Sequence, residues 1–250
     1  MGYTPKANAN SIFVAASDVY IAGADTSSDL VGPVIWKNSA RQFIGELGSV
    51  AMPSSVFVLS DDVYVAMSGG GKAILWKNGA TQFLGDNGKT ALANSVFVRG
   101  NDVYVAGAEG DSASLWKNGA IQFLNDGSKT AQANSVFVFG DDVYVAGRDG
   151  NNAALWKNGA AQNLESNGMS GTANSVFVYG GNVYVSGVKG GKAALWKNGA
   201  AQNLEGNGMS GTANSVFVYD GDVYVAGAIN GDASLWKNDI RLALGVPLFL

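Results

Sequence analysis

Short runs of β-branched and aromatic residues alternate along the whole chain with Gly, Asn and Asp. In the segment 94–124, residues 96–98, 103–107, 114–117 and 120–124 form four such runs, and turn-forming residues separate each run from the next. This pattern is typical of short β-strands joined by tight turns. No segment shows the apolar spacing of an amphipathic helix over several turns. We therefore expect an all-β protein.

The four-strand pattern recurs six times. Trp stands at six positions, each 40 residues after the last and each followed by Lys-Asn: Trp36, Trp76, Trp116, Trp156, Trp196 and Trp236. A Tyr in the second run keeps the same period, except for a first interval of 44 residues between Tyr20 and Tyr64. The segments 151–190 and 191–230 are identical at 31 of 40 positions, which indicates recent duplication or deliberate repetition. Each period is one supersecondary unit.

Two turns in each repeat predict how its strands pair. Asn118-Gly119, between the third and fourth runs, is a strong signal for a two-residue hairpin, because type I′ turns need a positive φ at both central residues. Gly100-Asn101 suits a similar turn between the first and second runs. We therefore expect four consecutive antiparallel strands in every repeat.

The turn positions also predict which residues share a face of the sheet. The two-residue turns pair Phe97 with Tyr104 and Trp116 with Ile121, and we further expect Tyr104 to face Trp116. Phe97, Tyr104 and Trp116 would then form an aromatic ladder on one face. The other face would be aliphatic, with Val96, Val98, Val103, Val105 and Leu115.

A sheet that is apolar on both faces must be covered on both. Six such sheets can cover one another by radial stacking, which closes a ring and protects the sheet edges. The sequence therefore predicts a single all-β domain over residues 1–250, a six-bladed β-propeller with four antiparallel strands per blade. The blades are expected at approximately 10–53, 54–93, 94–133, 134–173, 174–213 and 214–250.

Both terminal repeats are expected to keep their own strands. Repeat six retains a fourth strand near residues 240–244, and repeat one begins its first strand at Ser11, after a loop-like segment 2–10. We expect the apolar tail of Leu248, Phe249 and Leu250 to pack where the last repeat meets the first.

The repeated string resembles a known group of proteins. SVFVxGxDVYVAG followed by LWKNG stands at residues 95–119 and 135–159, with close copies elsewhere, over about 240 of the 250 residues. It resembles repeats of uncharacterised bacterial propeller-like proteins, often exported ones, and its strand order is similar to that of NHL-type propellers. The near-identical repeats also resemble engineered repeat propellers. The resemblance implies the fold and suggests export, and it carries no catalytic motif.

Composition excludes much of enzyme chemistry. The chain has no Cys and no His, so it lacks thiolate nucleophiles, Ser-His-Asp triads and imidazole metal sites. Its net charge of −4 argues against a nucleic-acid or anionic-membrane partner. No apolar run is long enough for a membrane-spanning helix, and residues 1–6 do not resemble a signal peptide. We expect a monomer without a cofactor or a metal.

Two repeated columns have both a structural and a functional interpretation. The Trp column could offer platforms for stacking sugars, but its place in the middle of a strand favours a core role. Carboxylates at Asp18, Asp62, Asp102, Asp142 and Asp222, with Asn182 as the exception, could bind a cation. Their position beside a tight turn favours local turn chemistry. Asp102 and Lys117 are then expected to be surface partners.

A third column opens the first strand of each repeat with Asn-Ser. These side chains could cap the preceding loop, or they could line the mouth of a central channel and bind a ligand. The candidate ligand-binding residues are Asn94, Ser95, Asn134, Ser135, Asn174, Ser175, Asn214 and Ser215. The variable connections between the second and third strands lie at the same end, where function is often located. The end with the Asn-Gly turns is expected to be flat.

The sequence favours a non-catalytic scaffold that binds a glycan, a peptide or a protein at its loop-rich end. The first alternative is a structural or engineered propeller without a natural ligand. The second is a hydrolase or lyase of the propeller type that uses only Asp, Glu, Arg and Tyr. Repetition places the carboxylates in like environments, whereas an acid–base pair needs unlike ones. This argues against the enzyme.

Overall fold

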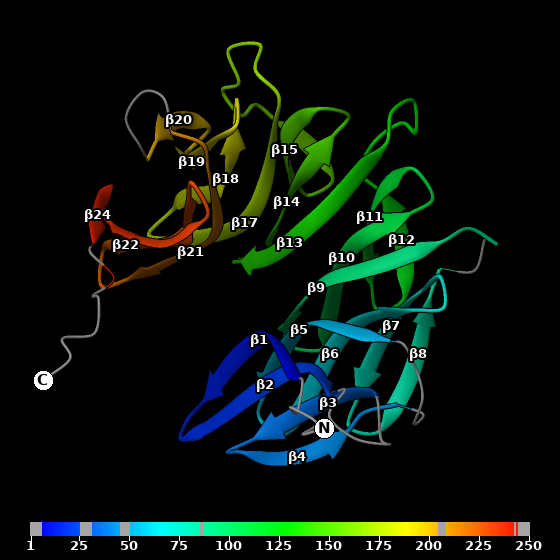
Figure 1. Ribbon diagram of the computed structural model, residues 1–250. Coiled ribbons are helices and arrows are strands. Elements are labelled where there is room, and N and C mark those ends of the chain that lie inside the picture. Colours follow the sequence, from blue (N-terminus) through cyan, green and yellow to red (C-terminus); the bar gives the residue numbers. More distant parts are fainter. Residues whose placement is uncertain are drawn as a thin grey trace, which may run out of the picture. The chain divides into compact units, whose positions relative to one another are not determined.

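The computed structural model describes residues 7–25, 32–45, 51–85, 88–204, 209–242 and 244. Within these ranges all regular secondary structure is β-strand, as expected. The strands form six four-stranded antiparallel sheets, each made of four consecutive strands (Figure 1). The chain divides into two compact units, Met1–Asp126 and Gly127–Leu250, with three sheets in each. A single domain over the whole chain stays a prediction, and the tail at 246–250 lies outside the described residues.

The strands of the first unit follow the predicted repeats. Its sheets consist of β1 (Ala7–Ala15), β2 (Asp18–Asp25), β3 (Gly32–Lys37) and β4 (Ala40–Phe43); β5 (Met52–Leu59), β6 (Asp62–Gly69), β7 (Lys72–Lys77) and β8 (Ala80–Leu84); and β9 (Ala91–Arg99), β10 (Asp102–Glu109), β11 (Ser112–Lys117) and β12 (Ala120–Phe123).

The second unit repeats the arrangement. Its sheets consist of β13 (Ala131–Phe139), β14 (Asp142–Asp149), β15 (Asn152–Lys157) and β16 (Ala160–Gln162); β17 (Gly171–Tyr179), β18 (Asn182–Lys189), β19 (Lys192–Lys197) and β20 (Ala200–Asn203); and β21 (Gly211–Tyr219), β22 (Asp222–Ile229), β23 (Asp232–Lys237) and β24 (Ile240–Leu242). The last sheet thus has its own fourth strand, as predicted.

The pairing of the second and third strands corrects the sequence prediction. Phe97 pairs with Tyr104 and Trp116 with Ile121, as expected, but Trp116 lies opposite Val105 rather than Tyr104. The reason is a tight turn at Gly110 and the residue after it, which joins Glu109 to Ser112 as the last pair. Because this turn has two residues, the pairing of the second and third strands differs by one position from the predicted pairing. A shift of one position places Trp116 on the opposite face of the sheet from Tyr104.

Each sheet therefore has a valine–tryptophan face and a tyrosine–leucine face. In the third sheet, Val96, Val105 and Trp116 share one face, while Phe97, Tyr104 and Leu115 share the other. Within each unit, the tyrosine–leucine face of one sheet packs on the valine–tryptophan face of the next. Tyr64 and Leu75 of the second sheet belong to the same buried cluster as Val96, Val105 and Trp116 of the third.

Aromatic ring contacts join the first strands of neighbouring sheets. Phe residues of successive first strands pack on one another, with ring centroids 4.7 Å apart for Phe13 and Phe57 and 4.8 Å apart for Phe57 and Phe97. The same contact joins Phe137 to Phe177 at 4.7 Å. At these separations the tilted rings add to the apolar packing of neighbouring first strands.

The first strand of each sheet starts earlier than predicted. β1 begins at Ala7 and pairs with β2 from there, so residues 7–10 are strand and not loop. The pairing shifts between Ala9 and Ser11, where Asn10 forms a β-bulge. Equivalent shifts occur in the other sheets. The bulge brings two backbones close together: a Cβ at Gly107 would lie 1.8 Å from the carbonyl oxygen of Leu92. Glycine is therefore required there.

Candidate functional site

The end of each sheet that carries the first-to-second and third-to-fourth turns is called the turn end here. In the third sheet, Asp102 Oδ2 lies 2.8 Å from Lys117 Nζ, and Asp102 Oδ1 accepts a hydrogen bond of 2.8 Å from Asn118 Nδ2. The Tyr104 hydroxyl donates to Asp102 Oδ2 at 3.3 Å. The expected Asp–Lys pairing is confirmed, and it recurs for Asp18 with Lys37, Asp62 with Lys77, Asp142 with Lys157 and Asp222 with Lys237.

These contacts keep the carboxylates ionised. Hydrogen bonds from Lys117 and then from Asn118 lower the pKa of Asp102 below its ordinary value. The pKa values of Asp18, Asp142 and Asp222 are lowered in the same way by their own Lys and Asn partners. A carboxylate with a lowered pKa is a poor proton donor near neutral pH. The network can therefore fix the turns, but it offers no general acid.

The Trp column belongs to the core in five of the six repeats. Trp76, Trp116, Trp156, Trp196 and Trp236 are buried, and Trp36 is half-buried. The indole N–H groups differ: Trp196 Nε1 donates to the carbonyl oxygen of Glu165 at 3.0 Å and Trp236 Nε1 to that of Leu204 at 3.1 Å. Trp116 Nε1 is buried and has no hydrogen-bond partner within the described ranges. None of the five buried rings is available as a stacking platform.

The Asn-Ser column ties neighbouring sheets together. Asn134 Nδ2 donates to the carbonyl oxygen of Ala173 at 3.0 Å, and the Ser135 hydroxyl accepts from Val176 N at 3.3 Å. Asn174 and Ser175 do the same toward the next sheet, as Asn10 and Ser11 do in the first unit. The first strand is a sheet edge, so its backbone groups at the bulge need partners from outside the sheet. The column supplies them.

The remaining candidate ligand-binding residues are placed as follows. Asn94 and Ser95 are half-buried, whereas Asn214 and Ser215 are exposed. Asn214 Oδ1 accepts a hydrogen bond of 2.8 Å from the Thr212 hydroxyl. A ligand role for the column stays a prediction, but at Asn134 and Asn174 the amide donors are already used between sheets. The repeated Asn-Ser pair in the sequence is compatible with hydrogen bonds between sheets, but the sequence analysis predicted only loop caps or ligand contacts for it.

Repeat two departs from the column and is compensated from another strand. Ser54 stands where the other repeats have Asn. In its place the Ser68 hydroxyl, on β6, accepts a hydrogen bond of 2.9 Å from Ala93 N. It also lies 3.4 Å from the carbonyl oxygen of Ala93. The contact between the second and third sheets thus keeps the bond from Val96 N to the Ser55 hydroxyl, and Ser68 stands in for the missing Asn side chain.

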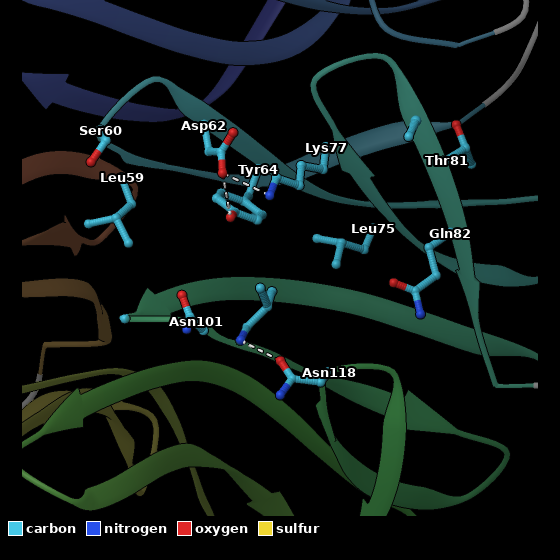
Figure 2. Close-up of a pocket in the computed structure, with 13 residues that line it drawn as sticks. Leu59, Ser60, Asp62, Tyr64, Leu75, Lys77, Thr81, Gln82, Asn101 and Asn118 are labelled. Atoms are coloured by element: carbon cyan, nitrogen blue, oxygen red, sulfur yellow. Dashed lines mark hydrogen bonds and ion pairs between the residues drawn. The ribbon is translucent and has the colours of Figure 1, made fainter.

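A cavity of about 670 Å³ opens between these same two sheets at the turn end (Figure 2). The Asp62–Lys77 pair lies on one side of it and Gln82 on the other, with Leu75 between them. The full lining is Leu59, Ser60, Asp62, Tyr64, Leu75, Lys77, Ala80, Thr81, Gln82, Gly100, Asn101, Val103 and Asn118. The expectation that this end is flat is therefore wrong for this pair of sheets.

The residue at the rim of the cavity is smaller than its counterparts in the second unit. Leu59 lies at its rim, and the corresponding residues of the fourth and fifth sheets are Phe139 and Tyr179. Between the fourth and fifth sheets the chain after β16 also fills the gap. Glu165 N donates to the carbonyl oxygen of Gly199, and Glu165 Oε2 accepts from Ala201 N at 3.1 Å.

Across the described ranges, no three His, Cys, Asp or Glu side chains gather as a metal site would require. The described part of the chain likewise has no helix long and apolar enough to cross a membrane.

Comparisons with known proteins identify the fold. A scan against protein-family models finds no match, and a search of curated proteins finds none either. Among solved structures, the chain is similar to the computationally designed Ika8 protein, with 16% identity and a TM-score of 0.54 over 92% of this chain and 71% of that one.

Two natural proteins show the same likeness. A catalytically inactive virginiamycin B lyase from Staphylococcus aureus, solved with quinupristin, has 11% identity and a TM-score of 0.60 over 94% of this chain and 83% of that one. A chain of a nidogen/laminin complex has 9% identity and a TM-score of 0.51 over 85% and 89%, respectively. With six four-stranded antiparallel sheets, the chain has the all-β fold of a six-bladed β-propeller, as predicted.

Proposed function

We propose that the chain is a non-catalytic repeat scaffold that binds a neutral polyhydroxylated ligand, such as a glycan, in the cavity between the β5–β8 and β9–β12 sheets. The observation that carries the proposal is the cavity itself, whose volume of about 670 Å³ lies in the range of small-molecule sites. A structural role without a ligand is the alternative, and the experiment below decides between them.

The lining favours a neutral ligand with hydroxyl groups. Its charged side chains, Asp62 and Lys77, neutralise each other at 2.8 Å, so the cavity carries no net charge from its lining. The Thr81 hydroxyl and the Gln82 amide offer both donors and acceptors, as sugar hydroxyls do. Leu59 and Leu75 supply apolar surface for the C–H faces of a sugar ring. A small set of polar groups on an apolar base is usual for ligand sites.

The same residues argue against catalysis at this site. The chain has no His or Cys to serve as a base or a nucleophile. Asp62 is the carboxylate in the lining, and the hydrogen bond from Lys77 lowers its pKa. Near neutral pH Asp62 is therefore an ionised, paired group without a second carboxylate in an unlike environment.

The test is a glycan array on the purified chain, followed by NMR titration of the sugars that bind. The variants Leu59→Phe and Thr81→Ala copy residues that the fourth sheet carries, Phe139 and Ala161, so they are compatible with the fold. We expect Leu59→Phe to abolish binding by filling the cavity, and Thr81→Ala to weaken it.

The matched control is Phe139→Leu, which makes the reverse exchange in the other unit and leaves the cavity unchanged. It should bind as the original chain does. If no sugar on the array binds, or if Leu59→Phe binds unchanged, the proposal fails and the structural role remains.

A further inference from the structure

One residue breaks the repeat pattern at the opposite end of the sheets, called the loop end here, where the second strand meets the third. The penultimate residue of the second strand is uncharged and no larger than valine in five repeats, and it is Arg148 in the fourth. The five others are Ala24, Ser68, Ala108, Val188 and Ala228. Arg148 is thus a specific addition to one blade and not part of the repeated framework.

The Arg148 side chain is half-buried and lacks an internal partner. Within the described residues its guanidinium takes part in no hydrogen bond, ion pair or ring contact. A guanidinium carries five N–H donors and is always charged. The guanidinium nitrogens are not among the buried polar atoms that lack a partner, so solvent and dissolved ligands can reach them. An anion from outside the chain would satisfy it.

Arg148 lines a depression of about 310 Å³ between the fourth and fifth sheets. Its partners in the lining include Asn151, Ser170 and Thr172, whose amide and hydroxyl groups can donate to oxygen atoms. Lys129 lies beside the depression, because a Cβ at Gly150 would lie 3.0 Å from Lys129 Cδ, but it is not part of the lining and has an interaction of its own.

The other side chains around Arg148 do not cancel its charge. Gln132 and Ala153 are its cross-strand neighbours and share its face of the sheet, and both are neutral. Asp149 follows Arg148 directly within β14, so alternation along the strand directs its carboxylate to the opposite face.

We propose that this depression binds the carboxylate of a small hydroxylated acid, such as a uronic acid. The planar guanidinium matches a carboxylate with two parallel hydrogen bonds. One guanidinium balances a single negative charge, whereas a phosphate group carries nearly two at neutral pH. Ser170, Thr172 and Asn151 are suited to the hydroxyl groups beside that carboxylate. The site lies in the other unit from the cavity proposed above and is independent of it.

The experiment measures the affinity of three probes by calorimetry or NMR: galacturonate, galactose and N-acetylalanine, an acid with a single carboxylate and no hydroxyl group. Galacturonate should bind most tightly, since it carries both the carboxylate and the hydroxyl groups. Arg148→Ala should weaken galacturonate binding about tenfold or more, because it removes charge-assisted hydrogen bonds. Ala108 and Ala228 show that the repeat tolerates Ala at this position.

A second variant tests whether a guanidinium on the next sheet can restore binding, and it shows whether the loss in Arg148→Ala comes from a folding defect. Val188→Arg, added to Arg148→Ala, places the guanidinium at the corresponding position of the fifth sheet. There the Ser210-Gly211-Thr212 segment repeats the Ser170-Gly171-Thr172 segment. The double variant should recover galacturonate binding, and near-UV circular dichroism should show that both variants stay folded.

Four results would overturn the proposal. The first three are galactose binding as tightly as galacturonate, unchanged galacturonate affinity in Arg148→Ala, and failure of all three probes to bind the original chain at millimolar concentration. The fourth is N-acetylalanine binding as tightly as galacturonate, which would reject a hydroxylated acid and indicate a peptide carboxylate instead.

Discussion

Asn174 donates a hydrogen bond from Nδ2 to the backbone carbonyl oxygen of Ala213, 3.0 Å away on the first strand of the next sheet. This bond gives a partner to an edge-strand carbonyl that the sheet itself leaves unpaired. The adjacent Ser175 hydroxyl accepts from Val216 N at 3.4 Å. Neighbouring sheets are therefore joined by polar contacts at the first strands as well as by apolar packing.

The first prediction concerns this polar contact. Asn174→Ala removes the donor and leaves the Ala213 carbonyl without its partner, so it should lower the free energy of unfolding by about 1–3 kcal/mol. Chemical denaturation of the variant measures the change. Asn203→Ala is the control, because Asn203 is an exposed residue of the same sheet whose side chain makes no hydrogen bond among the described residues. An equal loss in both variants would show that the contact between the sheets adds nothing.

The second prediction compares two buried tryptophans. Trp196 Nε1 donates to the carbonyl oxygen of Glu165 at 3.0 Å, whereas Trp116 Nε1 finds no hydrogen-bond partner in the part of the chain that the structure describes. Replacing either ring by Phe removes a similar apolar area, but only Trp196→Phe also leaves a carbonyl without its donor. We expect Trp196→Phe to cost about 1 kcal/mol more than Trp116→Phe. Equal losses in denaturant titrations would contradict this difference.

Truncation to Ala tests the packing of the same column. Trp116 is fully buried, so Trp116→Ala should cost about 3–5 kcal/mol, as the loss of a large aromatic side chain from a core usually does. Thermal or chemical unfolding gives the value. A thermally silent Trp116→Ala variant would show that the ring is not part of the core.

The sequence was sufficient for the strands, their order and most of their register. Regular turn residues such as Asn118-Gly119 define two of the three hairpins in each repeat, and these pairings were predicted correctly. The third hairpin was misjudged because its turn varies between repeats, as with Gly110 in one and Asn230 in another. Variation in residue type concealed a length of two residues, which five of the six repeats share. The error moved Trp116 to the opposite face of its sheet.

The candidate sites depend on features that repetition conceals. The side chains of the Asn-Ser column were identified from the sequence, but their partners lie about 40 residues away on another sheet, and no local pattern shows such contacts. The cavity is lined by residues of two sheets, and Leu59 at its rim stands where the fourth sheet has the larger Phe139. Arg148 could have been found by comparing columns, because it is the charged exception at its position. What the sequence could not show is that its guanidinium lacks a partner.

The last prediction concerns the response to acid. Hydrogen bonds from Lys117 and Asn118 lower the pKa of Asp102 in the folded chain, and similar contacts lower the pKa values of Asp18, Asp62, Asp142 and Asp222. An Asp whose pKa is lower in the folded chain than in the unfolded chain stabilises the fold. This stabilisation is complete at pH values above the pKa of the unfolded chain, which is about 4 for Asp. That contribution is lost as the pH falls through the folded value. The contribution of these five Asp residues to the free energy of unfolding should therefore stay constant between pH 7 and pH 5. It should decrease below about pH 4.

Repeat five shows how to test this response, because it carries Asn182 in place of the Asp. Asn182 still accepts a hydrogen bond of 2.8 Å from Asn198, but it cannot titrate. Replacing all five Asp residues by Asn should keep the turns intact and make the loss of stability between pH 4 and pH 2 shallower, as followed by thermal midpoints. Asp141→Asn is the control, since Asp141 is an exposed turn residue that forms no ion pair among the described residues. An unchanged acid slope in the fivefold variant would mean that the repeated Asp–Lys pairs do not contribute to folding.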